Sequence, residues 1–262
     1  MRTALVRRTV LTASAVSLAL LATACGSDKA DGKGDAKPDA RPSAASSAPV
    51  AAAKGKTDAD LTALLVTQAE VPDYLLKADA GAKLAQSDQT PITTDKPACK
   101  VLAQSQSLQK IGKPTGVART ALGAKPKDPA AGASDEEKAE AVKKALGITT
   151  TMTGLSSYDG QGAQETLAAF KTAGQICAGG FSATAGGETT KYQSVAAGPA
   201  VSAGDEAVSL ALTMDLEDGD KATLLTVMAR KGSTVATFSS ISLMGTAESP
   251  KTLIDTQVKK LG

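Results

Sequence analysis

The residues of this chain with the clearest chemical potential are its three cysteines, Cys25, Cys99 and Cys177. A thiol that acts as a nucleophile or redox centre needs a neighbour that stabilises the thiolate, and histidine is the commonest partner in that role. The chain contains no histidine, which also removes the commonest general base and metal ligand. We therefore expect no catalytic residue, no metal site and no cofactor, in a protein that is not an enzyme.

Residues 1–24 are typical of an export signal. A positive start with Arg2, Arg7 and Arg8 is followed by an apolar stretch from Val10 to Ala24. This stretch is too short to favour a membrane-spanning helix. The arginine pair with apolar residues after it also resembles a twin-arginine signal, so the general and the twin-arginine export routes both stay open.

The signal ends in Leu21-Ala22-Thr23-Ala24-Cys25-Gly26. This run resembles the lipobox of bacterial lipoproteins, in which small residues precede a cysteine that receives a diacylglyceryl group and becomes the new N-terminus. It departs from the usual pattern at Ala22, where leucine is usual. The alternative is an ordinary signal peptide cut nearby, with Cys25 a chance residue. We expect lipidation at Cys25, with two or three acyl chains holding the protein on the extracytoplasmic face of the cell membrane.

The segment after Cys25, up to residue 56, is rich in Ala, Ser, Pro, Lys and Asp and has almost no large apolar side chains. Such a segment cannot bury enough apolar surface to offset the entropy lost on ordering, so it is predicted to be disordered. A disordered tether would hold a folded domain clear of the membrane. The predicted organisation is a signal peptide (1–24), a lipidated cysteine with a tether (25–56) and a folded domain (57–262).

The other two cysteines, Cys99 and Cys177, each lie on a predicted helix, at 97–108 and 161–177. Outside the cytoplasm, two cysteines without other partners normally pair. Closing the long loop between them would stabilise the fold by about 4 kcal/mol on the chain-entropy model. The alternative is a redox or catalytic thiol, which here lacks an activating histidine. We expect a Cys99–Cys177 disulfide.

Other residue groupings carry weaker signals. Acidic residues crowd a predicted turn at 215–220 and could bind calcium, but their spacing is not that of an EF-hand and a solvated turn explains them. The glycine pairs at 179–180 and 186–187 lack a phosphate-loop pattern, and no serine lies in a hydrolase motif. The formal net charge of +2 and the aromatic content of 2% argue against nucleic acid as a partner.

The sequence pattern predicts secondary structure most clearly between residues 204 and 243. Apolar residues recur at every second position from Val208 to Leu216, which predicts a strand with one buried face and one wetter face. Asp218-Gly219 suits a tight hairpin turn, and further strands are predicted at 222–230 and 233–243. Such a meander has an apolar face that other elements must cover. We expect a single α+β domain in which helices cover an antiparallel sheet.

Helix boundaries are predicted from capping patterns and prolines. Thr57 and Ser134 each begin a capping box, Val71-Pro72 is expected to end the first helix, and residues 79–96 are expected to form a loop. Ser249-Pro250 is expected to cap the last helix. The remaining predicted strands lie at 115–122, 148–158, 181–185 and 190–196.

Several short motifs in the folded part occur in a familiar order: Val71-Pro72-Asp73-Tyr74, Ala98-Cys99-Lys100, 163–170, Ile176-Cys177, Gly204-Asp205-Glu206-Ala207 and Lys231-Gly232-Ser233-Thr234-Val235. This order resembles actinobacterial lipoproteins related to the extracellular sensor domain of PknH-type receptor kinases. The resemblance covers about residues 57–262. It implies an α+β domain with a disulfide and a central cleft for an unidentified ligand, and it carries over no catalytic residue. The sequence departs from the receptor kinases in having no kinase domain and no membrane helix, which argues against direct signalling.

Two functions stay open on these grounds. One is a non-enzymatic sensor-like or ligand-binding lipoprotein with an unidentified small or apolar ligand. The other is a carrier of lipids or other apolar molecules at the cell envelope. A carrier would have a dry cavity of roughly several hundred Å³ lined by Leu, Val and Met, whereas a sensor-like domain would have a shallow polar cleft.

Overall fold

A computed structural model describes residues 54–77, 79–126, 132–146, 148–216, 220–242 and 247–262. All of them belong to one compact unit, Ser47–Gly262, while a second unit, Met1–Ser46, lies outside the described residues. The predicted signal peptide, Cys25 and most of the predicted tether are therefore outside the described part of the chain, and so is most of the Asp218-Gly219 turn region.

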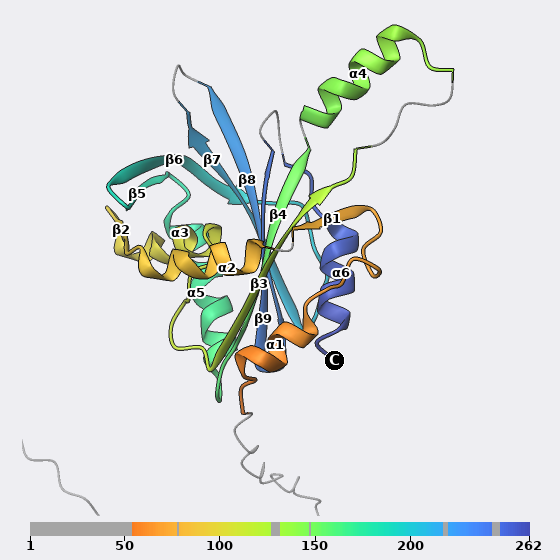
Figure 1. The fold of residues 1–262 in the computed structure, drawn as a ribbon. Coiled ribbons are helices and arrows are strands. Elements are labelled where there is room, and N and C mark those ends of the chain that lie inside the picture. Colours follow the sequence, from red (N-terminus) through yellow and green to blue (C-terminus); the bar gives the residue numbers. More distant parts are fainter. Residues whose placement is uncertain (1–53, 78, 127–131, 147, 217–219, 243–246) are drawn as a thin grey trace, which may run out of the picture. The chain divides into compact units, whose positions relative to one another are not determined.

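The fold is α+β, with a nine-stranded antiparallel sheet at its centre (Figure 1). The strand order is β1-β3-β4-β9-β8-β7-β6-β5-β2, so β1 and β2 form the two edges. The strands are β1 (Tyr74–Lys77), β2 (Ile92–Thr94), β3 (Gly116–Ala124), β4 (Thr149–Ser157), β5 (Phe181–Ala185), β6 (Glu188–Ala197), β7 (Glu206–Asp215), β8 (Lys221–Lys231) and β9 (Thr234–Ser242).

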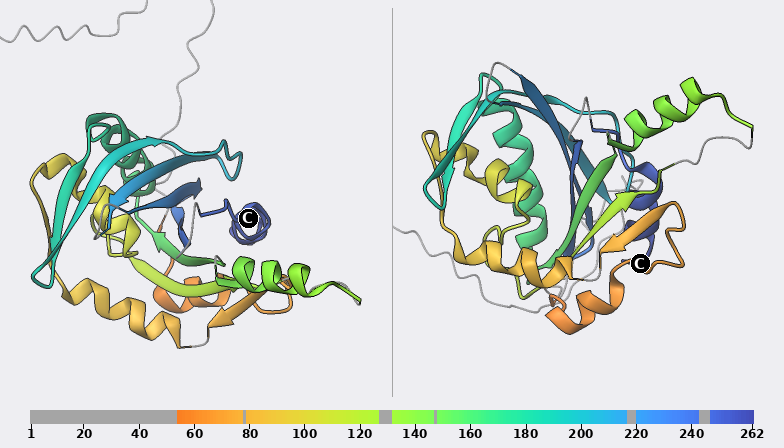
Figure 2. Two further views of the ribbon diagram at one scale, coloured as in Figure 1. Left: turned by 90° about the horizontal axis from the view of Figure 1, so that it is seen from above. Right: turned by 45° about the horizontal axis from the view of Figure 1, so that its top comes forward.

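Helices pack on both faces of this sheet (Figure 2). Helices α3 and α5 contribute to one hydrophobic cluster, and α1 and α6 contribute to a second cluster on the opposite face. Helix α4 stands away from the sheet in both figures. The helices are α1 (Asp58–Leu64), α2 (Ala80–Ala85), α3 (Lys100–Gln106), α4 (Asp135–Leu146), α5 (Gly162–Ile176) and α6 (Lys251–Lys259), with short 3-10 turns η1 (Gln86–Gln89) and η2 (Pro97–Cys99).

The predicted meander is present as β7, β8 and β9, each paired with the next along the chain. In β8 and β9, apolar side chains are buried on both faces of the sheet. Met228 belongs to the cluster with α3 and α5, whereas its neighbour Val227 belongs to the cluster with α1 and α6. Both faces of these central strands are buried because helices pack on either side of the sheet.

The first helix begins as predicted but ends earlier. Thr57 and Asp60 form the capping box at the start of α1. The helix ends at Leu64, before Val71-Pro72, because α6 supplies partners for its C-terminal end. The Gln257 side chain accepts a hydrogen bond from the Val66 N–H (3.0 Å) and donates one to the Leu64 carbonyl (2.8 Å). The chain then forms β1, a strand that no sequence pattern predicted.

Residues 79–96 are not the predicted loop, since they contain α2, η1 and β2. Three-residue and six-residue elements give little periodicity for a sequence pattern to reveal. Strand β2 forms because Ile92–Thr94 pair with β5, and the Ile92 side chain is buried in the cluster with α3 and α5.

The predicted caps of the later helices have different outcomes. At α4 the Ser134 hydroxyl accepts a hydrogen bond from the Glu137 N–H (3.2 Å), and the Glu137 carboxylate accepts one from the Ser134 N–H (2.7 Å), which confirms the capping box. At α6 the predicted Ser249 cap is wrong. The N-cap residue is Pro250, and the buried Ser249 hydroxyl has no hydrogen-bond partner among the described residues.

Candidate functional site

The sheet is bent into a cup, and one segment of chain joins its two edges. That segment, residues 79–90, leads from edge strand β1 to edge strand β2 and contains α2 and η1. We call it the strap. Figure 2 shows α2 crossing the open side of the cup, with α3 and α5 lying inside. Part of the concave face of the sheet is therefore covered by α3, α5 and the strap.

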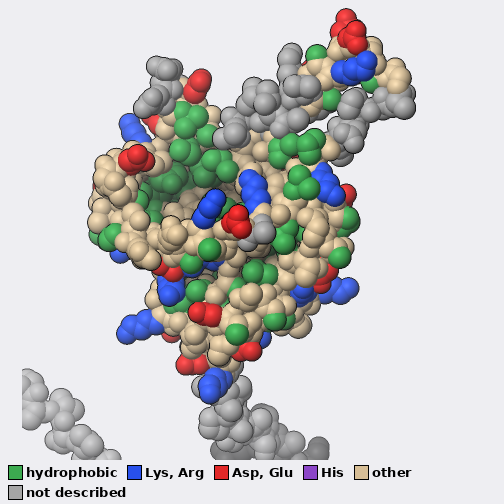
Figure 3. All heavy atoms as spheres, viewed as in Figure 1, with side chains coloured by type: hydrophobic (Ala, Val, Ile, Leu, Met, Phe, Trp, Pro, Cys, Tyr) green, Lys and Arg blue, Asp and Glu red, His purple; other side chains and the backbone are tan. Residues whose placement is uncertain are grey.

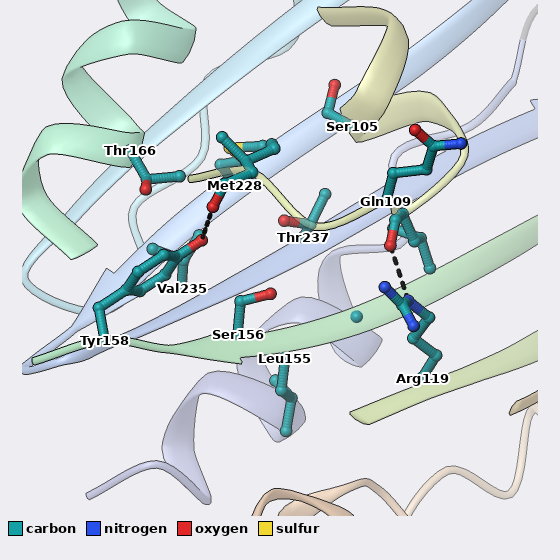
Figure 4. A pocket seen from close by; sticks show the side chains of 13 residues that line it. Ser105, Gln109, Arg119, Leu155, Ser156, Tyr158, Thr166, Met228, Val235 and Thr237 are labelled. Carbon is teal, nitrogen blue, oxygen red and sulfur yellow. Dashed lines mark hydrogen bonds between the residues drawn. The ribbon is translucent and has the colours of Figure 1, made fainter. Parts of the chain in front are cut away.

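A narrow cleft lies on this concave face, with free space of about 10 Å³, which is room for about one water molecule. It is bounded by the C-terminal end of α3 and the loop after it, by α5, and by strands β3, β4, β8 and β9 (Figure 4). Polar and apolar side chains share the lining, which comprises Ser105, Leu108, Gln109, Ile111, Arg119, Gly154, Leu155, Ser156, Tyr158, Thr166, Met228, Val235 and Thr237.

Arg119 of β3 stands at one end of the cleft (Figure 4), and its side chain is only 4% exposed. Its Nε donates to the Leu108 carbonyl (2.7 Å), and its Nη2 donates to both carboxylate oxygens of Asp88 on the strap (2.9 and 2.8 Å). A buried guanidinium is costly unless it is paired and hydrogen-bonded. Arg119 therefore ties the strap and the loop after α3 to the sheet.

Tyr158 stands at the other end of the cleft and holds the same loop (Figure 4). Its hydroxyl donates to the Ile111 carbonyl (3.0 Å). Burial raises the pKa of Tyr158, which keeps the phenol protonated as a donor. Between these two attachments Leu108 has a positive φ of 53°, a conformation that residues other than glycine rarely adopt. The Leu108 side chain packs over Gly154 of β4, where the missing Cβ leaves room for it.

Beside the cleft, a buried amide joins α3 to the sheet. The Gln106 Nε2 donates to the Thr226 hydroxyl, and the Gln106 Oε1 accepts from the Ser239 hydroxyl (3.1 Å). All three residues are buried. The two strand hydroxyls satisfy both ends of the Gln106 amide. The Gln106 side chain therefore holds α3 against the sheet, and its amide is already hydrogen-bonded.

Farther along the concave face, hydrophobic side chains gather in a hollow in front of β6, β7 and β8 (Figure 3). The register places Leu212 of β7 opposite Leu224 of β8, and Met214 opposite Ala222, all on the same face. Met214 and Ile241 are only partly buried, and they pack at the border of the hydrophobic cluster that includes α3 and α5. Leu216, which follows the end of β7, is 42% exposed. We call this region the apolar hollow.

Cys99 and Cys177 are joined in a disulfide with a Cα–Cα distance of 6.0 Å, the pairing expected from the sequence. Both residues are fully buried. The bond connects the start of α3 to the C-terminal end of α5, the two helices that fill the cup. The disulfide therefore fixes the position of two helices that bound the cleft. Cys25 is outside the described residues.

Among the described residues, no group of three or more His, Cys, Asp or Glu side chains is arranged to hold a metal ion. Glu217 and Asp218 of the acidic turn at 215–220 are not among them. Within the same residues, none of the helices has the length and apolar character needed to cross a bilayer.

Neither Arg119 nor Tyr158 belongs to a motif that predicted a site from the sequence. A signal for Arg119 was present, because it is the one charged residue in an otherwise small and apolar strand, 116–124. Its partner Asp88 lies in the segment that was expected to be a loop. Only the tertiary structure brings the two together.

Comparisons with known proteins give a distant structural likeness for this chain. No family model matches it, and no curated protein matches it. Among solved structures, it is similar to the crystal structure of the extracellular domain of PknH from Mycobacterium tuberculosis, at 13% sequence identity and a TM-score of 0.44. The match covers 79% of this chain and 97% of that chain. It is a distant likeness of fold.

Proposed function

We propose that this protein is a lipid-anchored extracytoplasmic binding module without catalytic activity. Cys25 carries the anchor, and the concave face of the sheet receives the ligand. The export signal and the small residues before Cys25 support the anchor. The Cys99–Cys177 disulfide supports an extracytoplasmic location, because such bonds persist mainly in oxidising compartments.

The apolar hollow is the observation that carries the binding proposal. The concave face continues beyond the part that α3 and α5 cover, and there Met214 and Ile241 stay partly exposed. Apolar side chains gathered in a concavity, next to a few polar groups, are the usual lining of a ligand site. Here the polar groups are those of the adjacent cleft, with Arg119 at its end.

The geometry favours a sensor-like or ligand-binding module over a carrier. A carrier must shield its cargo in an enclosed dry cavity, whereas the enclosed part of this site has free space of about 10 Å³ and a mixed polar lining. The hollow itself opens at the surface (Figure 3). A ligand bound there would keep one side accessible, as recognition by a further partner requires.

The polar residues of the cleft support a non-catalytic role for this site. Arg119 and Tyr158 both hold backbone carbonyls of the loop after α3. The rest of the described lining consists of hydroxyl, amide, thioether and hydrocarbon side chains and one glycine, so it offers no carboxylate, histidine or lysine that could act as a general base on a hydroxyl.

A fluorescent fatty acid tests the binding site in a matched pair of variants of the full chain. Leu216→Asp places a charge at the rim of the apolar hollow and should weaken binding about tenfold. Ile176→Asp makes the same kind of change at the end of α5, at a side chain that is 58% exposed, and should leave binding unchanged. Equal binding by both variants would contradict the proposed site.

A transfer assay separates the two functions. A carrier extracts the fluorescent fatty acid from donor vesicles and speeds its delivery to acceptor vesicles in proportion to protein concentration. A sensor-like module binds the probe without speeding delivery, which is the outcome we expect. Accelerated delivery would make the carrier the better assignment.

A further inference from the structure

The strap is attached to the rest of the domain by polar contacts. Neither α2 nor η1 buries a single side chain. Gln109 donates to the carbonyls of Ser87 and Thr90, and the Ser87 hydroxyl donates to the Ser107 carbonyl (3.1 Å). Segments with few buried apolar contacts open at low free energy while the core stays folded. The elements at either end are firmly placed, since β1 and β2 are paired in the sheet.

Asp88 and Arg119 form the central attachment. The Asp88 carboxylate, 20% exposed, receives two hydrogen bonds from the buried Arg119 side chain and one from the Lys110 N–H (2.9 Å). If the strap moved away, Arg119 would be left without its anionic partner, at a large cost. A ligand with its own anionic group removes that cost, because it replaces the Asp88 carboxylate on the guanidinium.

One face of β3 runs from Arg119 toward the apolar hollow. Alternation along β3 puts Arg119, Ala121 and Gly123 on one face, and a Cβ added at Gly123 would meet nothing within 4 Å. Gly123 pairs with Thr150 of β4, and Thr150 pairs with Ile241 at the border of the hollow. The backbone of α2 lies beside β3 at the Arg119 end of this face, since a Cβ at Gly81 would lie 2.6 Å from the Arg119 carbonyl oxygen.

We propose that the strap is a latch for an anionic amphiphile: the head group of a long-chain carboxylate displaces Asp88 from Arg119, the strap moves away, and the alkyl chain lies along β3 in the apolar hollow. This inference rests on the proposed binding function and adds the class of ligand and the element that controls access. The charge and the apolar surface that such a molecule needs occur on one continuous face of the sheet.

The two latch residues should have opposite effects on ligand affinity. Decanoate and decanol, which share a chain length, are titrated into the full chain carrying Cys25→Ala to remove the lipid. We expect decanoate to bind at least tenfold more tightly than decanol. Asp88→Asn weakens the closed strap and should tighten decanoate binding about threefold or more, whereas Arg119→Met should weaken it about tenfold and abolish the preference for the carboxylate.

Two control variants, Arg230→Met and Asp205→Asn, distinguish loss of the latch from a general loss of folding. Each substitution disrupts an ion pair of similar length (2.9 Å) at the far end of β8 and should leave decanoate affinity unchanged. Gly81→Ala lifts the strap without altering the latch pair, and should also tighten binding. Amide hydrogen exchange in residues 79–90 should rise with Asp88→Asn, with Gly81→Ala, and in the unsubstituted strap when decanoate is added.

The outcomes separate this inference from the proposed function. Equal affinity for decanoate and decanol, or loss of affinity in both latch variants, would overturn the latch while leaving a ligand site in the hollow. Unchanged exchange in the strap on adding decanoate would overturn it as well. Failure of decanoate, decanol and the fluorescent fatty acid to bind would overturn both proposals.

Discussion

Buried polar side chains join distant parts of this chain. Gln257 of α6 is fully buried, yet both ends of its amide are hydrogen-bonded to the backbone where α1 ends. Lys260, one turn later, donates to the Leu65 carbonyl (2.9 Å) and pairs with Glu70 (2.8 Å). The last carbonyls of a helix have no partner within the helix. Here the side chains of a C-terminal helix supply the partners.

Acid should weaken this junction at a defined pH. Hydrogen bonds from Lys260, and then from the Thr67 backbone and hydroxyl, lower the pKa of Glu70 from 4.5 to about 2. The unfolded state therefore binds this proton first as pH falls. The contribution of Glu70 to stability is complete above pH 4.5 and is lost as pH falls toward 2.

Urea denaturation between pH 6 and pH 2 measures this effect by difference. Glu70→Gln should lose less stability than the unsubstituted protein over the interval from about pH 4.5 to about pH 2. Lys260→Met removes the main cause of the shift and should flatten the dependence in the same way. Parallel curves for all three proteins would show that Glu70 does not contribute.

At the scale of the elements, one side chain covers the edge of strand β1 that would otherwise be open to pairing with another chain. Gln68 accepts a hydrogen bond from the Leu76 N–H (3.0 Å) and donates one to the Tyr74 carbonyl (2.7 Å). These groups belong to the edge of β1 that does not pair with β3. An open edge is a template for pairing with another chain, and Leu75 on the same strand is 50% exposed. Gln68 occupies the place of a neighbouring strand.

Gln68→Ala should expose this edge and promote self-association. Sedimentation velocity at rising protein concentration should show dimers or larger species at concentrations at least several-fold lower than for the unsubstituted protein. Gln104→Ala also removes a hydrogen bond from a glutamine to a backbone carbonyl (3.0 Å), but on α3. It should behave like the unsubstituted protein, and equal association of both variants would contradict the role of Gln68.

In the molecule as a whole, the chain enters the domain at the end of the sheet opposite the hollow. The Gly55 N–H donates to Asp159 (2.8 Å), and the Lys56 N–H donates to the hydroxyl of Ser157, the last residue of β4 (3.0 Å). The apolar hollow borders Ile241, which pairs with Thr150 near the start of β4. The first described residues of the chain therefore contact the domain away from the proposed ligand site.

Cys25→Ala tests two proposals together: that Cys25 carries the anchor, and that the anchor is separate from the ligand site. The variant should leave the membrane fraction almost completely, because a polypeptide without the acyl chains keeps no comparable membrane affinity. Mass spectrometry of the unsubstituted protein should find a diacylglyceryl group on an N-terminal Cys25. Affinity for the fluorescent fatty acid should be the same in both forms. A variant that stays on the membrane, or a mature chain that starts elsewhere, would contradict the anchor.

Much of the architecture could be predicted where a signal is local. Alternation predicted β7, and the patterns beginning at Thr57 and Ser134 predicted where α1 and α4 start. Prediction failed where a distant residue decides the outcome. Helix α1 stops at Leu64 because Gln257 binds its end, and a pattern in the vicinity of residue 64 carries no information about residue 257.

The candidate site shows the same division. The sequence by itself determined the types of residue available: two cysteines to pair, no histidine, and strands rich in Val, Leu and Thr. The tertiary structure alone decided that the strap joins the two edges of the sheet and that Asp88 meets Arg119. Sheet pairing and buried ion pairs depend on partners far apart in the chain, so their geometry exists only once the sheet has closed around α3 and α5.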